Sequence, residues 1–163
     1  MPRISPKYQI ILIAMLLLST PMNFAEEVYE HGHGAMQLFD DQGMANTPQW
    51  VMAWIYFMLA SFLASLFFVK NHSEARWVAA CFFIGAGIIV VSTRILGVPQ
   101  LSGFIALIHI LAWTPALAIL IKRRPFLKGF SPYSIWTGVM TFVISFSFVF
   151  DIRDASIFLS NYF

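Results

Sequence analysis

A single histidine lies near the middle of an apolar stretch, Ser102 to Ile121, that is long enough to cross a lipid bilayer. On a helix that turns about 100° per residue, this histidine shares one narrow face with small and polar side chains. The members of that face are Ser102, Ala106, His109, Trp113 and Ala116. Because lipid cannot hydrogen-bond to an imidazole, we expect this face to pack against other protein.

An imidazole inside a membrane costs free energy unless it has a partner, so such residues mark functional sites by default. His109 is therefore a candidate proton relay, metal or haem ligand, or substrate contact. The alternative, which we favour at this point, is a structural hydrogen bond between helices, with Tyr56, Ser92 or a threonine of the last span as the partner. A haem held by two histidines within the membrane is not expected, because no other histidine is predicted at the depth of His109.

Two further histidines, His31 and His33, lie one residue apart in an acidic loop that is rich in glycine. Imidazole and carboxylate groups in such a loop can bind a divalent metal ion. The additional candidate ligands are Glu26, Glu27, Glu30 and Met36. Because an H-x-H pattern has no defined partner spacing, we favour a solvated acidic loop. We predict no cofactor, with a divalent metal or haem as minor alternatives.

Charged residues also border the predicted spans. Arg94 follows the second span, and Asp151, Arg153 and Asp154 follow the last one. We expect Arg94 to pair with Asp151 or Asp154 and so to join two span ends, and such ion pairs are usually structural. The basic run from Lys122 to Ser131 is explained as a topology determinant, with contact to anionic lipid as the alternative.

The composition assigns the chain to a membrane. Hydrophobic residues make up 59% of the sequence and charged residues 11%, against about a quarter charged in soluble domains. The apolar residues come in runs of span length and do not alternate around a water-soluble core. The net charge of +2 comes from basic residues beside these runs, so it does not indicate nucleic-acid binding. The single cysteine, Cys81, excludes an internal disulfide.

The order of these segments predicts an all-α integral membrane protein with an antiparallel four-helix transmembrane bundle. The predicted spans are 50–69, 77–93, 102–121 and 133–150. An acidic segment, 26–49, precedes this domain, and a tail, 151–163, follows it. Residues 1–25 have the positive start, short apolar core and helix-breaking proline of a signal peptide. We favour cleavage after residue 25, and the alternative is a retained fifth, N-terminal helix.

The distribution of basic residues predicts the orientation. With the amino terminus in the cytoplasm, eight of the ten Lys and Arg residues lie inside and only Arg94 and Arg153 lie outside. Basic residues near span ends prefer the cytoplasmic side. We therefore expect a bacterial-type inner-membrane protein with residues 70–76 and 122–132 in the cytoplasm. Residues 26–49 and the carboxyl terminus would face outward.

The sequence favours a non-enzymatic accessory or assembly subunit of a membrane complex. The chain is short, its loops are short, and few polar groups lie within its spans. Its expected partners are the lipid bilayer and either other membrane subunits or further copies of itself. The first alternative is a small transporter or channel with His109 at its site and Arg94 near its outer mouth. A metal- or haem-binding membrane protein ranks third.

Overall fold

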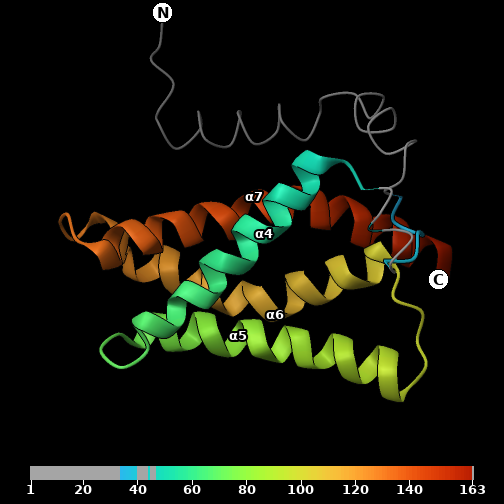
Figure 1. The fold of residues 1–163 in the computed structure, drawn as a ribbon, viewed down its shortest axis with the longest axis horizontal. Coiled ribbons are helices and arrows are strands. Elements are labelled where there is room, and N and C mark those ends of the chain that lie inside the picture. The colour runs from blue at the N-terminus through green and yellow to red at the C-terminus, as the bar shows by residue number, and fades with distance from the viewer. Residues whose placement is uncertain (1–33, 40–43, 45–46, 163) are drawn as a thin grey trace, which may run out of the picture. The chain divides into compact units, whose positions relative to one another are not determined.

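The computed structural model describes residues 34–39, 44 and 47–162, and these residues form an all-helical structure without strands. Residues 1–25 and the two candidate metal ligands, His31 and His33, lie outside the described residues. The elements in chain order are α4 (Gln49–Leu63), the 3₁₀ helix η1 (Ala64–Phe67), α5 (Ser73–Val90), the π helix η2 (Val91–Ile95), α6 (Ser102–Arg123), the 3₁₀ helix η3 (Pro125–Leu127) and α7 (Pro132–Tyr162) (Figure 1).

The last helix differs most from its predicted bounds. It begins as expected, with Pro132 as its first residue and the Ser131 hydroxyl accepting a hydrogen bond from the backbone N–H of Ser134 at 3.1 Å. However, α7 continues for 31 residues, where we expected a span over 133–150 and a separate tail. No glycine or proline follows Gly138, so no residue ends the helix at Phe150. The charged residues after Phe150 therefore belong to the same helix as the span.

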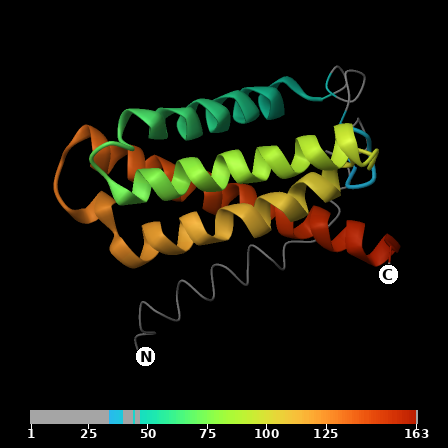
Figure 2. The ribbon, with the colours of Figure 1, turned by 90° about the horizontal axis from the view of Figure 1, so that it is seen from below.

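The helices run antiparallel to their neighbours in the chain. Glu74 at the beginning of α5 contacts Arg123 at the end of α6. His109 in the first half of α6 contacts Asp151 in the second half of α7. Figures 1 and 2 show α5, α6 and α7 along one another, and Figure 1 shows α4 crossing them obliquely.

The tight core occupies one half of the bundle. Its buried members are Phe62, Ala75, Val78, Cys81, Trp113, Ala116, Leu120, Trp136, Met140 and Ile144. All of them lie in the half of their helix that is nearer to the turns 68–72 and 124–131. We call this half the basic end, because it carries Lys70, Arg76, Lys122, Arg123, Arg124 and Lys128. The opposite end carries residues 96–101 and the end of α7.

At the opposite end, residues 34–39 cover the beginning of α6. The first N–H groups of a helix have no partner within the helix. Here the N–H of Ser102 donates to the carbonyl oxygen of Gln37 at 3.0 Å, and that of Gly103 donates to Ala35 at 2.7 Å. This short segment therefore caps α6 with its backbone, and no side chain is needed for that role.

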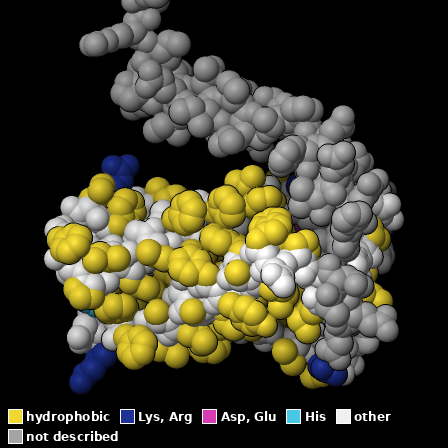
Figure 3. Space-filling model, turned by 45° about the horizontal axis from the view of Figure 1, so that its top comes forward, with side chains coloured by type: hydrophobic (Ala, Val, Ile, Leu, Met, Phe, Trp, Pro, Cys, Tyr) yellow, Lys and Arg dark blue, Asp and Glu magenta, His cyan; other side chains and the backbone are white. Residues whose placement is uncertain are grey.

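Within the described residues, four helical segments are long and apolar enough to cross a membrane, which supports a multi-pass membrane protein. They are Gln49–Phe67, Ser73–Ile95, Ser102–Leu127 and Pro132–Asn161. Figure 3 shows hydrophobic side chains over much of the described surface on the visible face, with Lys and Arg side chains towards the ends. A surface of this kind is stable in lipid, where exposed apolar side chains carry no hydration cost. The structure thus confirms the four predicted apolar spans.

Candidate functional site

A histidine and an aspartate from different helices meet in the half of the bundle away from the basic end. Nδ1 of His109 lies 3.5 Å from Oδ2 of Asp151. Both side chains are mostly buried, with 18% and 15% of their surfaces exposed. His109 lies seven residues into α6, which is about 10 Å from the end of the helix. The pair therefore lies within the apolar length of α6 and α7, well inside the bundle.

A close approach of the two helices sets the register that brings this pair together. A Cβ atom on Gly103 would lie 2.6 Å from Cβ of Phe158 and 2.7 Å from the carbonyl oxygen of Asp154. Only glycine, which lacks Cβ, allows the backbones to approach in this way. Asp151 precedes Phe158 by two helical turns, and His109 follows Gly103 by almost two turns in the opposite direction. Their side chains consequently face each other.

The surroundings of Asp151 make its charge costly. Its Oδ2 atom is buried and has no hydrogen-bond partner within the described part of the chain, since 3.5 Å to His109 is long for a hydrogen bond. An ionised carboxylate in an apolar environment costs several kcal/mol without a counter-charge. Protonated His109 supplies that charge, and a proton on Asp151 removes the need for it. Either arrangement keeps the pair neutral with one shared proton, so the site can hold and exchange a proton.

Trp113 closes the site on the side of the basic end. Its ring stacks on His109 with the ring centroids 3.9 Å apart and the planes at 14°, and only 2% of the residue is exposed. An aromatic face in this position stabilises a protonated imidazole. Trp113 also contacts Phe62 of the tight core at 4.6 Å between centroids. The indole therefore lies between the His109–Asp151 pair and the rest of the tight core at the basic end.

Arg94 does not form the ion pair that we predicted. It is exposed, and no ion pair joins it to Asp151 or Asp154 in the part of the chain that the structure describes. Asp151 instead contacts His109, and the Asp154 carboxylate accepts from Arg153 at 3.5 Å. The physical reason is the continuous α7, which carries Asp151 into the bundle when we had expected it at the boundary.

The other sequence candidates remain apart from this site. Tyr56 is 62% exposed and is not the partner of His109. No group of three or more metal-ligating side chains occurs among residues 34–39, 44 and 47–162, and His31 and His33 are not among these residues. Sequence reasoning missed Asp151 as the partner of His109. The usable signal was the lack of any helix-breaking residue after Phe150.

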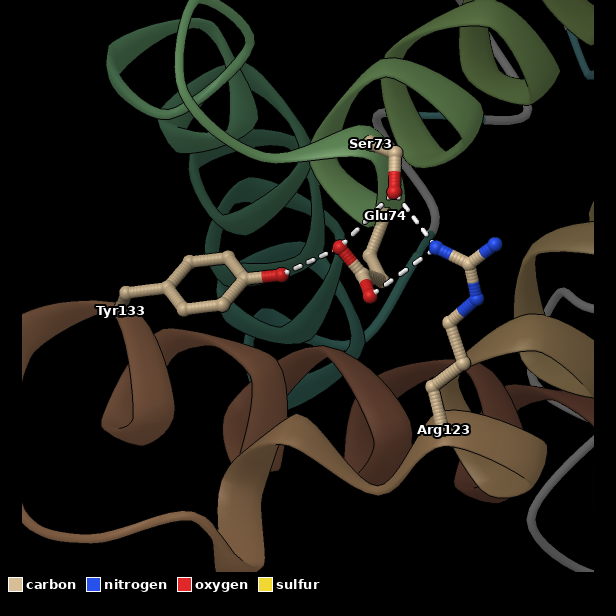
Figure 4. Close-up of polar contacts among 4 residues, drawn as sticks. All are labelled: Ser73, Glu74, Arg123 and Tyr133. Atoms are coloured by element: carbon tan, nitrogen blue, oxygen red, sulfur yellow. Dashed lines mark hydrogen bonds and ion pairs between the residues drawn. The ribbon is translucent and has the colours of Figure 1, made fainter.

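A second polar cluster joins three helices at the basic end (Figure 4). The Glu74 carboxylate accepts hydrogen bonds from Arg123 Nη1 at 3.2 Å and from Tyr133 Oη at 3.0 Å. Ser73 Oγ donates to the same carboxylate at 3.2 Å and accepts from Arg123. Each of the four groups thus has at least one partner within the cluster, and the cluster ties α5, α6 and α7 together. A cluster whose polar groups bond to one another in this way suits a structural role.

The chain matches no known protein family, and no curated protein or solved structure is significantly similar to it. A function for this chain therefore has to follow from its own residues. The His109–Asp151 pair is the feature whose chemistry is hardest to explain by packing alone, because it places ionisable groups within apolar helices.

Proposed function

We propose that the protein is a small multi-pass transporter in which the His109–Asp151 pair carries a proton. The supporting observation is the 3.5 Å contact between these two ionisable groups inside apolar helices. Ionisable residues at such positions are costly and typically belong to proton or ion paths. An imidazole without a charged partner would suit a structural role in an accessory subunit better. Because the carboxylate of Asp151 faces His109, we favour proton exchange over a structural role for this pair.

The uneven packing of the bundle favours a transporter over an open pore. The tight core fills the half of the bundle at the basic end. The His109–Asp151 pair lies in the other half and keeps some exposed surface. A proton at the pair would thus be exchanged from the opposite end, while Trp113 and the core close the way to the basic end. Transport would require a second conformation, as in alternating access.

We also propose an orientation for the bundle in the membrane. The basic end would face the cytoplasm of a bacterial-type inner membrane, because eight of the ten Lys and Arg residues then lie inside. Residues 1–25 would act as a cleaved signal peptide. The opposite end, from which the pair is reached, would then face outward, where protons enter an energised cell.

Proton flux in proteoliposomes tests the proposal. The purified chain is reconstituted with a pH-sensitive dye inside the vesicles, and a potassium diffusion potential is imposed with valinomycin. We expect the wild-type protein to change the internal pH, and the variants His109→Ala and Asp151→Asn each to lower the initial rate by tenfold or more. Losing either partner removes the shared proton site, and general acid–base groups of this kind typically contribute about 10²-fold or more to rates.

Two controls separate function from folding. Lys122→Gln removes a charge at the basic end, away from the pair, and should retain the wild-type rate. Helix content and a monodisperse elution profile in detergent should be the same for all variants. Wild-type protein that moves no protons under these conditions, or a His109→Ala variant with the wild-type rate, would rule out the proposed role of the pair.

The second candidate remains a non-enzymatic subunit of a membrane complex, and an aromatic surface on α4 and α7 favours it. This surface consists of Trp54, Phe57, Phe142 and Phe146, whose rings contact one another. Phe57 and Phe142 are 47% and 57% exposed. In the most apolar stretch of Gln49–Phe67 only 17% of the residues are buried, which leaves room for a helix of another subunit. A pull-down in mild detergent that returns only this chain would eliminate this candidate.

A further inference from the structure

A cavity of about 530 Å³ opens at the opposite end of the bundle, beside η2. Cavities that hold small molecules commonly measure about 300–1,000 Å³. Its lining residues are Leu38, Phe39, Met44, Thr93, Arg94, Val98 and Gln100. The cavity therefore combines one cation, two uncharged polar groups and four apolar side chains, and none of these described lining residues is acidic.

Arg94 is the residue of this lining that can bind an anion. Its side chain makes no hydrogen bond or ion pair with any residue from 34–39, 44 or 47–162. The neighbouring hydroxyl of Thr93 already donates to the carbonyl oxygen of Ile89 at 2.8 Å. Arg94 lies in the π helix η2, and such rare segments are frequent at functional sites. An unpaired guanidinium matches a carboxylate or phosphate group, to which it can donate two hydrogen bonds.

The remaining walls suit an apolar tail. Leu38, Met44 and Val98 contribute aliphatic surface. One backbone hydrogen bond joins two of the lining residues: the N–H of Phe39 donates to the carbonyl oxygen of Gln100 at 2.7 Å. The cavity lies at the end of apolar spans, where the headgroups of a bilayer begin.

We propose that this cavity binds an anionic amphiphile, with the carboxylate or phosphate group on Arg94 and the apolar chain along Leu38 and Val98. This ligand chemistry has two sources, a phospholipid of the membrane or a free fatty-acid-like molecule. The proposal is independent of proton transfer at His109, because it depends on different residues.

Photolabelling of the full chain in phosphatidylcholine nanodiscs tests the proposal. The probe is a twelve-carbon fatty acid with a diazirine in its tail, and labelled residues are identified by mass spectrometry. We expect saturable labelling at the described lining residues Leu38, Phe39, Met44, Val98 and Gln100. Arg94→Gln should weaken the apparent affinity by roughly tenfold to a hundredfold, the range for a charge-assisted hydrogen bond. Arg94→Lys should weaken it less, because the charge remains.

Matched controls identify the cause of any change. Lys122→Gln removes an equivalent charge at the basic end and should leave labelling unchanged. Val98→Trp fills the cavity and should abolish labelling while Arg94 is retained. Adding phosphatidylglycerol to the nanodiscs decides the source: competition identifies a membrane lipid, and undiminished labelling identifies a free carboxylate. Equal labelling of Arg94→Gln, or equal labelling by the corresponding diazirine alcohol, would overturn the proposal.

Discussion

Gly103 and Phe158 approach so closely that a Cβ atom on the glycine would lie 2.6 Å from Cβ of the phenylalanine. Real Cβ atoms do not tolerate such a contact, so one added methyl group must push α6 and α7 apart. The same approach places His109 opposite Asp151. The contact between Gly103 and Phe158 therefore holds the candidate site in register as well as packing two helices.

The first prediction follows from this contact. Gly103→Ala should lower the free energy of unfolding by about 1–3 kcal/mol, the usual cost of overpacking a tight interface. Gly87→Ala is the matched control, because no described residue beyond its own helix turns lies within 4 Å of its Cβ position and alanine favours a helix. Titration with SDS in mixed micelles, followed by circular dichroism, measures the free energy of unfolding of both variants. Equal stability of the two variants would show that the helices do not approach as described.

A second prediction compares two buried tryptophans. Nε1 of Trp136 donates to the carbonyl oxygen of Ser61 at 2.9 Å, whereas Nε1 of Trp113 has no hydrogen-bond partner within the described residues. Replacement by phenylalanine removes a hydrogen bond only at Trp136. We expect Trp136→Phe to cost about 1 kcal/mol more than Trp113→Phe in the same unfolding assay. The reverse order would mean that the indole of Trp113 has a partner, such as bound water.

The third prediction concerns the polar cluster at the basic end. Tyr133→Phe should lower the free energy of unfolding by about 1 kcal/mol, because it removes one hydrogen bond to Glu74. Arg123→Gln should cost less, about 0.2–1 kcal/mol, because the Arg123 side chain is 49% exposed and its ion pair is screened by water. Added salt should reduce the effect of Arg123→Gln but not that of Tyr133→Phe. Unfolding titrations at low and high salt distinguish the two.

A fourth prediction tests the orientation. Cys81 is the only cysteine and is buried, so Cys81→Ala provides a background without thiols. In this background, Leu96→Cys should react with a membrane-impermeant maleimide in intact cells. Lys128→Cys should react only after lysis, because the positive residues hold the basic end inside. Labelling of Lys128→Cys in intact cells would contradict the proposed topology. His109 would then be reached from the cytoplasm.

The helix beginnings show what local sequence can predict. Ser131 and Pro132 start α7 where expected, because the capping hydroxyl and the fixed proline φ act within a single turn. The helix end was predicted less well. Charged residues from Asp151 onwards suggested a boundary in water, but charge alone does not break a helix. α7 continues to Tyr162, and this last part of the helix packs against α6 where Phe158 meets Gly103.

The sequence by itself determined the class of the protein and its four apolar spans. The length and hydropathy of a run are local properties, and they decide whether the run is stable across a lipid bilayer. The tertiary structure alone decided which polar groups meet. His109 faces Asp151, and Glu74 faces Arg123 and Tyr133, because the register between helices depends on close contacts such as that of Gly103. The sizes of the side chains on both helices of an interface set this register. It therefore cannot be predicted from one stretch of sequence alone.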